Sequence, residues 1–299
     1  MKKIQMVDLQ SQYQKIKNEV DEKVLNVMQS AQFINGPEVQ NFQKELEQYL
    51  GVKHVIPCAN GTDALQIALM ARDLQPGDEV ITADFTFAAT VEVVHLLKLK
   101  SVLVDVDYDT FNIDIEKLKA AITPKTKAII PVHLFGQCAN MEAVLEVAKE
   151  YNLFVVEDNC QGIGADFTFS DGTVKKSGTM GTIGTTSFFP SKNLGCYGDG
   201  GAIFTNDDEL AYKMRGIVNH GMYKRYYHDE VGVNSRLDSV QAAVLRVKLP
   251  LLDSYNAARR SAADYYDKAF ANHPNILTPK RAVNSTHVFH QYTLRILNG

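Results

Sequence analysis

The first fifty positions place hydrophobic residues at the three- and four-residue spacing of amphipathic helices. Within residues 13–28 the hydrophobic positions on one face are Ile16, Val20, Val24 and Val27. Within residues 37–50 they are Val39, Phe42, Leu46 and Leu50. Pro37 suits a first helical position and Gly51 suits the position after a helix, so both ends of the second segment are marked. The spacing predicts two helices, over 13–28 and 37–50.

From residue 54 onward, short uninterrupted hydrophobic runs alternate with helical patterns. The runs cover residues 54–57, 79–82, 101–104, 128–132 and 154–156. The helical patterns between them cover residues 62–72, 86–98, 114–122 and 140–151. Strands that are hydrophobic on both faces and alternate with helices are typical of a mostly parallel sheet covered on both sides. The pattern therefore predicts an α/β fold.

The second half of the chain departs from this alternation. The glycine-rich stretch 162–201 predicts antiparallel or irregular pieces around a site. After residue 236 a long helical pattern is interrupted at Pro250 and continues over 251–272. A last strand is predicted over 288–296.

The interruption at Pro250 also predicts a domain boundary. Residues 1–249 would form a large domain, and residues 250–299 the start of a smaller one. The sequence stops just after the strand predicted near its end. We therefore expect the smaller α/β domain to be incomplete in this chain.

Composition and charge narrow the class of protein. Hydrophobic residues make up 45% and charged residues 22%, the balance of a globular protein. The net charge of -4 gives no broad basic surface, so we expect no nucleic-acid partner. No hydrophobic run approaches the ~18–20 residues of a membrane-spanning helix, and residues 1–8 lack the hydrophobic segment of a secretory signal. The expected location is the cytoplasm, without a membrane partner.

The cysteines indicate no metal site. Their positions are Cys58, Cys138, Cys160 and Cys196. None belongs to a CxxC pair and none has a histidine at ligand spacing. We expect buried, reduced thiols rather than metal ligands or a disulfide framework.

A lysine lies in a serine- and glycine-rich segment, residues 187–201. Most lysines are solvated surface charges, and Lys192 alone would carry little weight. Small residues, however, let a backbone approach a ligand closely, and the hydroxyls of Ser187 and Ser191 can donate to a phosphate. A lysine in a polar pocket is also the usual source of a nucleophilic amine. Lys192 is therefore a candidate nucleophile.

Two acids, Glu157 and Asp158, end the hydrophobic run 154–156, where open α/β sheets bind their ligands. One interpretation is a turn with solvated acids. The other is that Asp158 faces a ring nitrogen and keeps it protonated, because a nearby carboxylate favours the charged form. A pyridoxal ring needs that proton to act as an electron sink. The residues alone leave both interpretations open.

Residues 58–65 contain a strand end, a glycine turn and a helix start. Thr62 or Asp63 would cap the helix in the simpler interpretation. The same geometry offers backbone N–H groups and the positive end of a helix dipole to a phosphate. The segment is neither a P-loop nor a GxGxxG motif, which disfavours the usual mononucleotide sites.

Together these segments resemble the DegT/DnrJ/EryC1/StrS family of sugar-nucleotide aminotransferases, a branch of the fold-type I pyridoxal-phosphate (PLP) enzymes. The similar segments are residues 7–9, 33–39, 61–65, 76–81, 85–90, 133–136, 157–158, 187–201 and 232–236. They occur in order along essentially the whole chain, which is more specific than any one motif. The resemblance implies a mostly parallel, seven-stranded-type sheet with a smaller C-terminal domain.

The resemblance also implies a role for particular residues. Lys192 would hold PLP as a Schiff base, and Asp158 would pair with the pyridine nitrogen. The other cofactor-binding positions would be Gly61, Thr62, Phe87, Gln161, Ser187 and Asn234. Phe87 would stack on the ring, although a lone phenylalanine is more often a core residue. Asn234, otherwise a turn residue, would reach the phosphate of a neighbouring subunit, which predicts a homodimer with shared active sites.

Within the family, residues 187–210 look most similar to enzymes that act on UDP-linked 3-keto-N-acetylglucosaminuronate. The implied reaction moves an amino group from glutamate to a keto-sugar nucleotide, in surface polysaccharide biosynthesis. Lys192 would serve as covalent anchor and as general acid and base. Two alternatives are an aminotransferase or dehydratase for another keto-sugar nucleotide, and a non-catalytic regulatory protein with the same fold. The presence of Lys192 and Asp158 argues against the dehydratase and the regulatory protein.

One further segment, residues 220–228, concentrates cations and aromatic residues just before Asn234. It is either an exposed loop with solvated charges or a loop that engages an anionic substrate. Arg225 is the candidate substrate ligand, because a guanidinium can grip a carboxylate or phosphate through two parallel hydrogen bonds.

Overall fold

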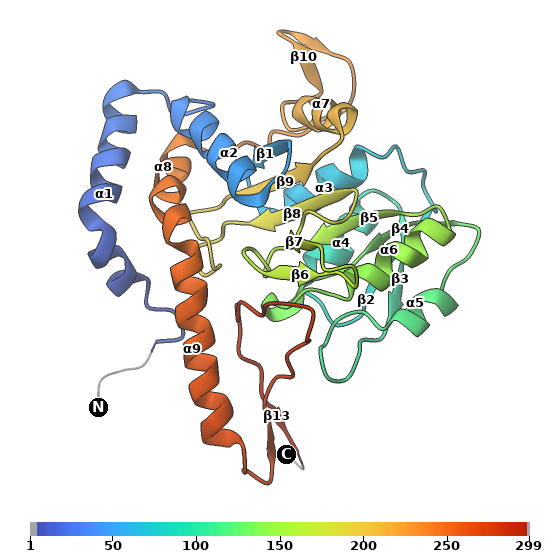
Figure 1. The fold of residues 1–299 in the computed structure, drawn as a ribbon. Helices are drawn as coiled ribbons and strands as arrows, with labels where there is room; N and C mark the ends of the chain where they lie inside the picture. The colour runs from blue at the N-terminus through green and yellow to red at the C-terminus, as the bar shows by residue number, and fades with distance from the viewer. Residues whose placement is uncertain (1–4, 298–299) are drawn as a thin grey trace.

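The computed structural model describes residues 5–297, which are built around a seven-stranded sheet (Figure 1). Its strand order is β1-β9-β8-β5-β4-β2-β3. The strands are β1 (His54–Cys58), β2 (Glu79–Ala83), β3 (Lys100–Val104), β4 (Thr126–Ile130), β5 (Phe154–Asp158), β8 (Ile183–Ser187) and β9 (Gly201–Thr205). Strand β9 is antiparallel to both neighbours, and the other adjacent pairs are parallel. The predicted mostly parallel sheet is confirmed.

Helices cover both faces of this sheet (Figure 1). On one face lie α3 (Gly61–Met70), α4 (Ala89–Leu96) and α7 (Asp208–Ile217), and on the other lie α2 (Pro37–Leu50), α5 (Ile115–Ala120) and α6 (Met141–Glu150). Side chains alternate along each strand, so Val156 packs beneath α3 while its neighbour Val155 packs on the α6 side. Burial on both faces explains why the strands read as uninterrupted hydrophobic runs.

Three further helical segments lie beside the sheet. They are α1 (Leu9–Ser30), α8 (Ser239–Lys248) and α9 (Leu252–Phe270). Ile16 and Val20 of α1 pack against Val244 of α8, which confirms the apolar face predicted for the first helix. Pro250 lies in η2 (Leu249–Leu251), the short 3-10 turn between α8 and α9, so the predicted interruption is confirmed as well. The predicted helices within 54–151 are present, although α4 and α5 are shorter than expected.

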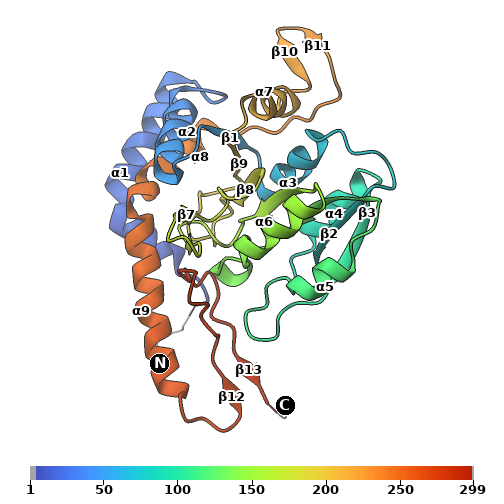
Figure 2. The same cartoon turned by 45° about the vertical axis from the view of Figure 1, so that its right-hand side comes forward.

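The glycine-rich stretch contains the expected antiparallel pieces. Its short hairpin pairs β6 (Asp166–Thr168) with β7 (Val174–Lys176), and β8 then pairs antiparallel with β9. A second hairpin, β10 (Met222–Lys224) and β11 (Tyr227–His228), projects beyond α7 at the top of the molecule (Figures 1 and 2).

The strand predicted over 288–296 is wrong. Only β13 (Arg295–Ile296) pairs, with β12 (Ile276–Leu277), at the far end of the C-terminal segment (Figure 2). Phe289 has a positive φ of 45°, which breaks an extended strand. The backbone of this segment is instead bonded by side chains and loops, since Asn193 donates to the Val288 carbonyl and Val288 donates to the Gly136 carbonyl. The domain division at residue 250 stays a prediction.

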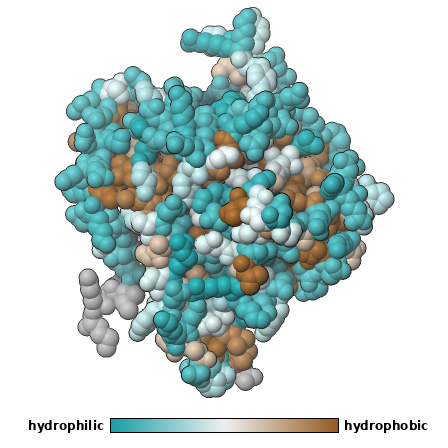
Figure 3. Space-filling model, in the orientation of Figure 1, coloured by the Kyte–Doolittle hydropathy of each residue, from teal (hydrophilic) through white to brown (hydrophobic). Residues whose placement is uncertain are grey.

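The surface of one face is mostly hydrophilic, with hydrophobic residues in separate patches (Figure 3). Within residues 5–297, no helix is both long enough and hydrophobic enough to cross a membrane. Residues 1–4, on which part of the expectation about a secretory signal rests, lie outside the described part of the chain.

Candidate active site

A cavity of about 690 Å³ opens at the carboxyl ends of the parallel strands. Most of its lining residues come directly after β1, β2, β5 and β8, the edge where open α/β sheets bind ligands. The predicted residues that line it are Gly61, Thr62, Phe87, Asp158, Gln161, Ser187 and Lys192. The fold thus brings all but one of the predicted cofactor-binding positions into one pocket.

Lys192 lies half-buried on the loop between β8 and β9. Backbone hydrogen bonds from Lys192 N–H to the Phe189 carbonyl and from Cys196 N–H to the Phe188 carbonyl, each 2.8 Å, hold this loop. A side chain at Gly195 would place its Cβ 2.5 Å from the Pro190 carbonyl oxygen, so the tight loop needs glycine there. The Lys192 amine has no hydrogen bond or ion pair with any residue in the described range. It is available to react with a ligand.

Asp158, at the end of β5, faces the same pocket and is only 5% exposed. Its Oδ2 accepts a hydrogen bond from the Thr90 hydroxyl at 2.8 Å, and its Oδ1 accepts from the Cys160 N–H at 3.2 Å. Thr90 is itself bonded to Thr86, at 2.9 Å, which fixes its hydroxyl. Both donors to the carboxylate are neutral, so its charge has no cationic partner within residues 5–297. A buried charge without such a partner is costly, and a ligand that carries an N–H⁺ group would balance it.

The amino end of α3 forms another wall of the pocket. Asn60 caps this helix, because its Oδ1 accepts from the Asp63 N–H at 2.8 Å, so the alternative of a Thr62 or Asp63 cap is wrong. The cap leaves the N–H groups of Gly61 and Thr62 without helical acceptors. A Cβ at Gly61 would lie 2.7 Å from Cβ of Ser187, so only glycine allows the helix end and the serine to meet. Free N–H groups at a helix start, next to a hydroxyl, suit a phosphate.

Gln161 and Phe87 complete the pocket wall. The Gln161 Oε1 accepts from the Phe135 N–H at 2.6 Å, which leaves the amide NH₂ as a donor. Phe87 is 71% exposed, so the alternative interpretation as a core aromatic is wrong. Burial, with a smaller contribution from the Asp158 carboxylate, raises the pKa of the Cys160 thiol well above its usual range. Cys160 therefore stays protonated and does not compete with Lys192 as a nucleophile.

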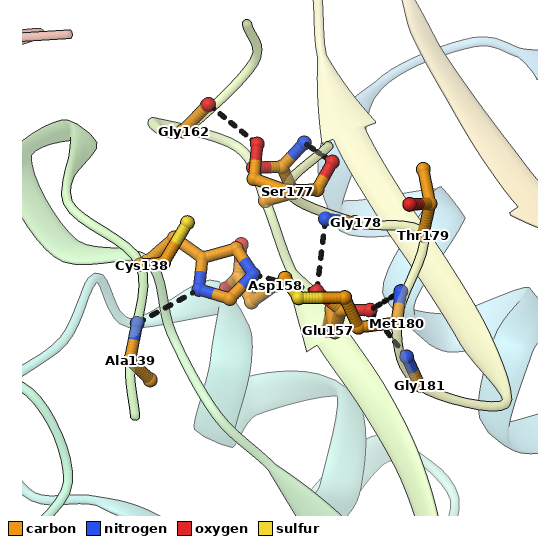
Figure 4. Close-up of polar contacts among 12 residues, drawn as sticks. Cys138, Ala139, Glu157, Asp158, Gly162, Ser177, Gly178, Thr179, Met180 and Gly181 are labelled. Carbon is orange, nitrogen blue, oxygen red and sulfur yellow. Dashed lines mark hydrogen bonds and ion pairs between the residues drawn. The ribbon is translucent and has the colours of Figure 1, made fainter. Parts of the chain in front are cut away.

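Glu157 lies on the other face of β5 and is fully buried (Figure 4). Its carboxylate accepts four hydrogen bonds, from His133 Nε2 and from the backbone N–H groups of Gly178, Met180 and Gly181. His133 Nδ1 accepts from the Ala139 N–H at 3.2 Å, so the imidazole proton is on Nε2 and points to Glu157 at 2.7 Å. Glu157 is thus an anchor for the loop 177–181, and the expectation of a solvated acid is wrong for it.

Asn234 and Arg225 lie outside the pocket of their own chain. Asn234 is exposed and forms an isolated bridge with Asn219, although the next residue, Ser235, accepts from the Ala59 N–H at 3.0 Å. Arg225 is exposed in the turn between β10 and β11, where its guanidinium lies 5.0 Å from the Tyr226 ring centroid. The four cysteines are free, and Cys160 lines the pocket.

Several residues of the pocket lining were not singled out from the sequence, among them Asp199, His290 and Gln291. Asp199 belonged to the glycine-rich segment, where its charge was not singled out. His290 and Gln291 lie in the range 288–296, for which only a strand was predicted. No motif in that segment marked them as pocket residues.

Comparison with known sequences gives consistent matches along nearly the whole chain. The sequence profile described as the DegT/DnrJ/EryC1/StrS aminotransferase family matches residues 14–299. The UDP-2-acetamido-2-deoxy-3-oxo-D-glucuronate aminotransferase of Pseudomonas aeruginosa is 49% identical over 295 residues, which cover 99% of this chain and 80% of that protein. The pleiotropic regulatory protein of Geobacillus stearothermophilus is 48% identical over 98% of this chain and 78% of its own length. The UDP-N-acetyl-3-dehydro-alpha-D-glucosamine 3-aminotransferase of Acidithiobacillus ferrooxidans is 43% identical over the same shares.

Solved structures agree with these sequence matches. The structure of DesV from S. venezuelae in complex with a ketimine intermediate is 38% identical, with a TM-score of 0.95, and is matched over 99% of this chain and 78% of that one. NtdA from Bacillus subtilis with bound cofactor PMP is 35% identical, with a TM-score of 0.86, over 94% of this chain and 64% of that one. Fold, pocket and relatives together define an aminotransferase. The chain belongs to the DegT/DnrJ/EryC1/StrS aminotransferase family, as its sequence indicated.

Proposed function

We propose that this chain is a PLP-dependent aminotransferase that moves an amino group from glutamate to a keto-sugar nucleotide. The proposed acceptor is UDP-linked 3-keto-N-acetylglucosaminuronate, and the amino sugar would serve surface polysaccharide synthesis in the cytoplasm. The observation that carries the proposal is that one pocket holds an unbonded Lys192 amine and the buried Asp158 carboxylate. The names of the Pseudomonas and Acidithiobacillus relatives, which are aminotransferases of UDP-linked 3-oxo or 3-dehydro sugars, support the choice of acceptor.

The pocket residues fit PLP at three points. The Lys192 amine suits the aldehyde carbon, and the Asp158 carboxylate suits the pyridine nitrogen. The start of α3, with Gly61 and Thr62 next to Ser187, suits the phosphate. The exposed ring of Phe87 offers a stacking surface, and the free NH₂ of Gln161 suits the phenolic oxygen. When bound, PLP supplies an electron-accepting ring that stabilises negative charge on the carbon attached to the reacting nitrogen.

The protein's own residues would orient the reactants and move protons. Lys192 would hold the cofactor until the amino donor displaces it, and its freed amine would then carry a proton from one carbon to the next. Asp158 would keep the ring nitrogen protonated, because its negative charge favours the cationic form. Thr90 would hold Asp158 in place through the 2.8 Å hydrogen bond.

We place the complete active site in a homodimer. Asn234 does not line the pocket of its own chain, yet the family resemblance gives it a role at the phosphate. A symmetric dimer resolves this, because each chain would lend its Asn234 to the partner's pocket. Mixed dimers of Lys192→Ala and Asn234→Ala chains should regain part of the activity, since one of the two pockets then has both groups. No recovery after demonstrated subunit exchange would refute the shared site.

Arg225 would act in the same shared arrangement. The β10–β11 hairpin projects away from the sheet (Figure 2). Arg225 is exposed on it, and its guanidinium lies beside the Tyr226 ring. From there it would grip the carboxylate of the uronate in the partner's pocket. The expected effect of Arg225→Ala is a higher KM for the sugar nucleotide with little change in the glutamate half-reaction. A change confined to the glutamate side would contradict this role.

The function is tested with purified protein, PLP, glutamate and a panel of UDP-linked keto sugars, followed by mass spectrometry of the amino-sugar products. We expect amination of the 3-keto uronate, and none by Lys192→Ala. Lys175→Ala is the matched control, because Lys175 is exposed on β7, away from the pocket residues. If only a 4-keto sugar nucleotide is aminated, the proposed 3-keto acceptor is wrong. Normal amination by Lys192→Ala would refute the site.

A further inference from the structure

The C-terminal segment 287–291 borders the pocket and contributes His290 and Gln291 to its lining. Arg259 of α9 donates to the carbonyls of Phe289, at 3.0 Å, and His290, at 3.3 Å. Gln291 N–H donates to the Phe135 carbonyl at 3.3 Å on the other side. The backbone on both sides of His290 is therefore held, so the imidazole has a defined position in the pocket.

A chain of amides determines which imidazole nitrogen carries the proton. The Asn193 NH₂ donates to the Val288 carbonyl at 3.0 Å and to the Asn256 Oδ1 at 2.7 Å. Asn256 in turn donates its own NH₂ to a backbone carbonyl, that of Ile163. Because backbone carbonyls only accept, both amide orientations follow. The Asn193 Oδ1 is thus an acceptor, and the His290 Nδ1, 3.3 Å away, must donate to it.

The other nitrogen, Nε2, is then free of a proton. Burial above all, and then the positive charges of Lys192 and Arg259, lower the pKa of His290 to about 3. The ring is neutral at any pH at which the enzyme would work, and Nε2 presents a lone pair to the pocket. A lone pair repels phosphate and carboxylate oxygens, so His290 is not an anion ligand. It can bind only a group that donates a hydrogen bond.

We propose that His290 is a specificity-determining residue whose Nε2 accepts a hydrogen bond from the sugar ring of the acceptor substrate. The donor is a sugar O–H or the N–H of the acetamido group. This inference rests on the proposed function, since it assigns the residue to the sugar-nucleotide half of that reaction. A buried acceptor that loses its donor costs more than an ordinary contact, so the histidine discriminates against sugars that lack the group.

Two variants separate the proposed contact from the anchoring bond. His290→Asn keeps a donor at the place of Nδ1, and so keeps the bond to Asn193, but removes Nε2. His290→Gln keeps an amide oxygen near the place of Nε2 but gives up the bond to Asn193. Titration calorimetry of the PLP-loaded protein with the sugar nucleotide should give a Kd raised roughly tenfold by His290→Asn. His290→Gln should stay within about threefold of the unmodified protein.

Sugar analogues identify the donor. If the donor is an O–H, a sugar analogue without that hydroxyl should bind the unmodified protein more weakly, but should bind His290→Asn no differently. If the donor is the acetamido N–H, an analogue without that N–H should show this pattern instead. The inference is overturned if His290→Asn binds the sugar nucleotide normally, or if it lowers PLP affinity and melting temperature, which indicates a structural role. It is also overturned if both half-reactions slow equally with unchanged Kd, which indicates a partner for Lys192. Absence of a glutamate half-reaction in the unmodified protein would instead refute the proposed function.

Discussion

Glu157 and Asp158 are neighbours on β5, point to opposite faces of the sheet, and are both buried, at 0% and 5% exposure. Glu157 accepts from an imidazole and three backbone N–H groups, whereas Asp158 accepts from one hydroxyl and one N–H. The histidines beside them differ in the same way. Both nitrogens of His133 are bonded, while only Nδ1 of His290 has a partner among residues 5–297.

This difference in hydrogen bonding distinguishes a structural anchor, Glu157 with His133, from residues of a ligand site, Asp158 with His290. A buried polar group whose bonds are complete contributes order and has nothing left for a ligand. On the anchor side, Glu157 ties the loop 177–181 to the sheet, just before β8 leads to Ser187 and Lys192 (Figure 4). On the pocket side, incomplete bonding of Asp158, Lys192 and His290 leaves charge and lone pairs for a ligand to complete. The comparison predicts that changes on the two sides affect different measurements.

The largest expected effect is on the pocket side. Asp158→Asn should lower the rates of both half-reactions by about two orders of magnitude or more, because the ring nitrogen loses the charge that keeps it protonated. The melting temperature should change little, since the amide keeps the size of the side chain. Single-turnover absorbance changes with glutamate give the rates. Near-normal rates would remove Asp158 from the catalytic role.

The corresponding change on the anchor side is Glu157→Gln. It should lower the free energy of unfolding by about 3 kcal/mol, because an NH₂ group would face backbone N–H donors inside the protein. Denaturant unfolding measures this loss. Glu116→Gln is the matched control, since Glu116 is exposed on α5 and its carboxylate pairs, within residues 5–297, only with Lys119 at 3.3 Å. A Glu157→Gln variant that keeps its full stability but loses the half-reactions would contradict the assignment of Glu157 as a structural anchor.

A smaller effect is expected for the residue that holds Asp158. Thr90→Val removes the hydroxyl donor without a large change in volume, and should lower the half-reaction rates about tenfold. Thr90→Ser should restore most of the rate, because it retains a hydroxyl. Equal defects in both variants would show that Thr90 acts through packing and not through its bond to Asp158.

The smallest effect concerns pH. Burial lowers the pKa of His290 to about 3, so between that pH and 6.5 the unfolded chain binds a proton that the folded chain does not. Stability from the neutral ring is therefore present above pH 6.5 and is lost as the pH falls toward 3. His290→Asn should reduce the pH dependence of unfolding near pH 5 by about 1 kcal/mol per pH unit. An unchanged slope would mean that the ring is protonated in the folded protein.

Part of the fold and of the candidate site could be predicted from the sequence. The strand and helix pattern up to residue 158 predicted the sheet. Lys192, Asp158 and Gly61 were candidates because of their neighbours in the sequence, and the resemblance to the family gave them their roles. The distinction between Glu157 and Asp158 could not be predicted. The donors that complete Glu157 lie on the loop 177–181, whose path depends on how the glycine-rich stretch folds.

The C-terminal segment is a second part of the molecule whose structure could not be predicted from the sequence. A strand was predicted over 288–296, but only its last part forms one, β13 (Arg295–Ile296), which pairs with β12. Its carbonyls are bonded by Asn193 and Arg259, which are distant in sequence, and these long-range bonds place His290 in the pocket. The cap of α3 was missed for a local reason, because Asn60 precedes the glycine that was taken as the turn.

The central claim is that the unbonded amine of Lys192 is the group that binds PLP. Reduction of the PLP-loaded protein with borohydride, followed by peptide mass spectrometry, tests it most directly. The account predicts one phosphopyridoxyl adduct, on the peptide that contains Lys192. An adduct on another lysine, or a reduced protein without an adduct, would contradict the account.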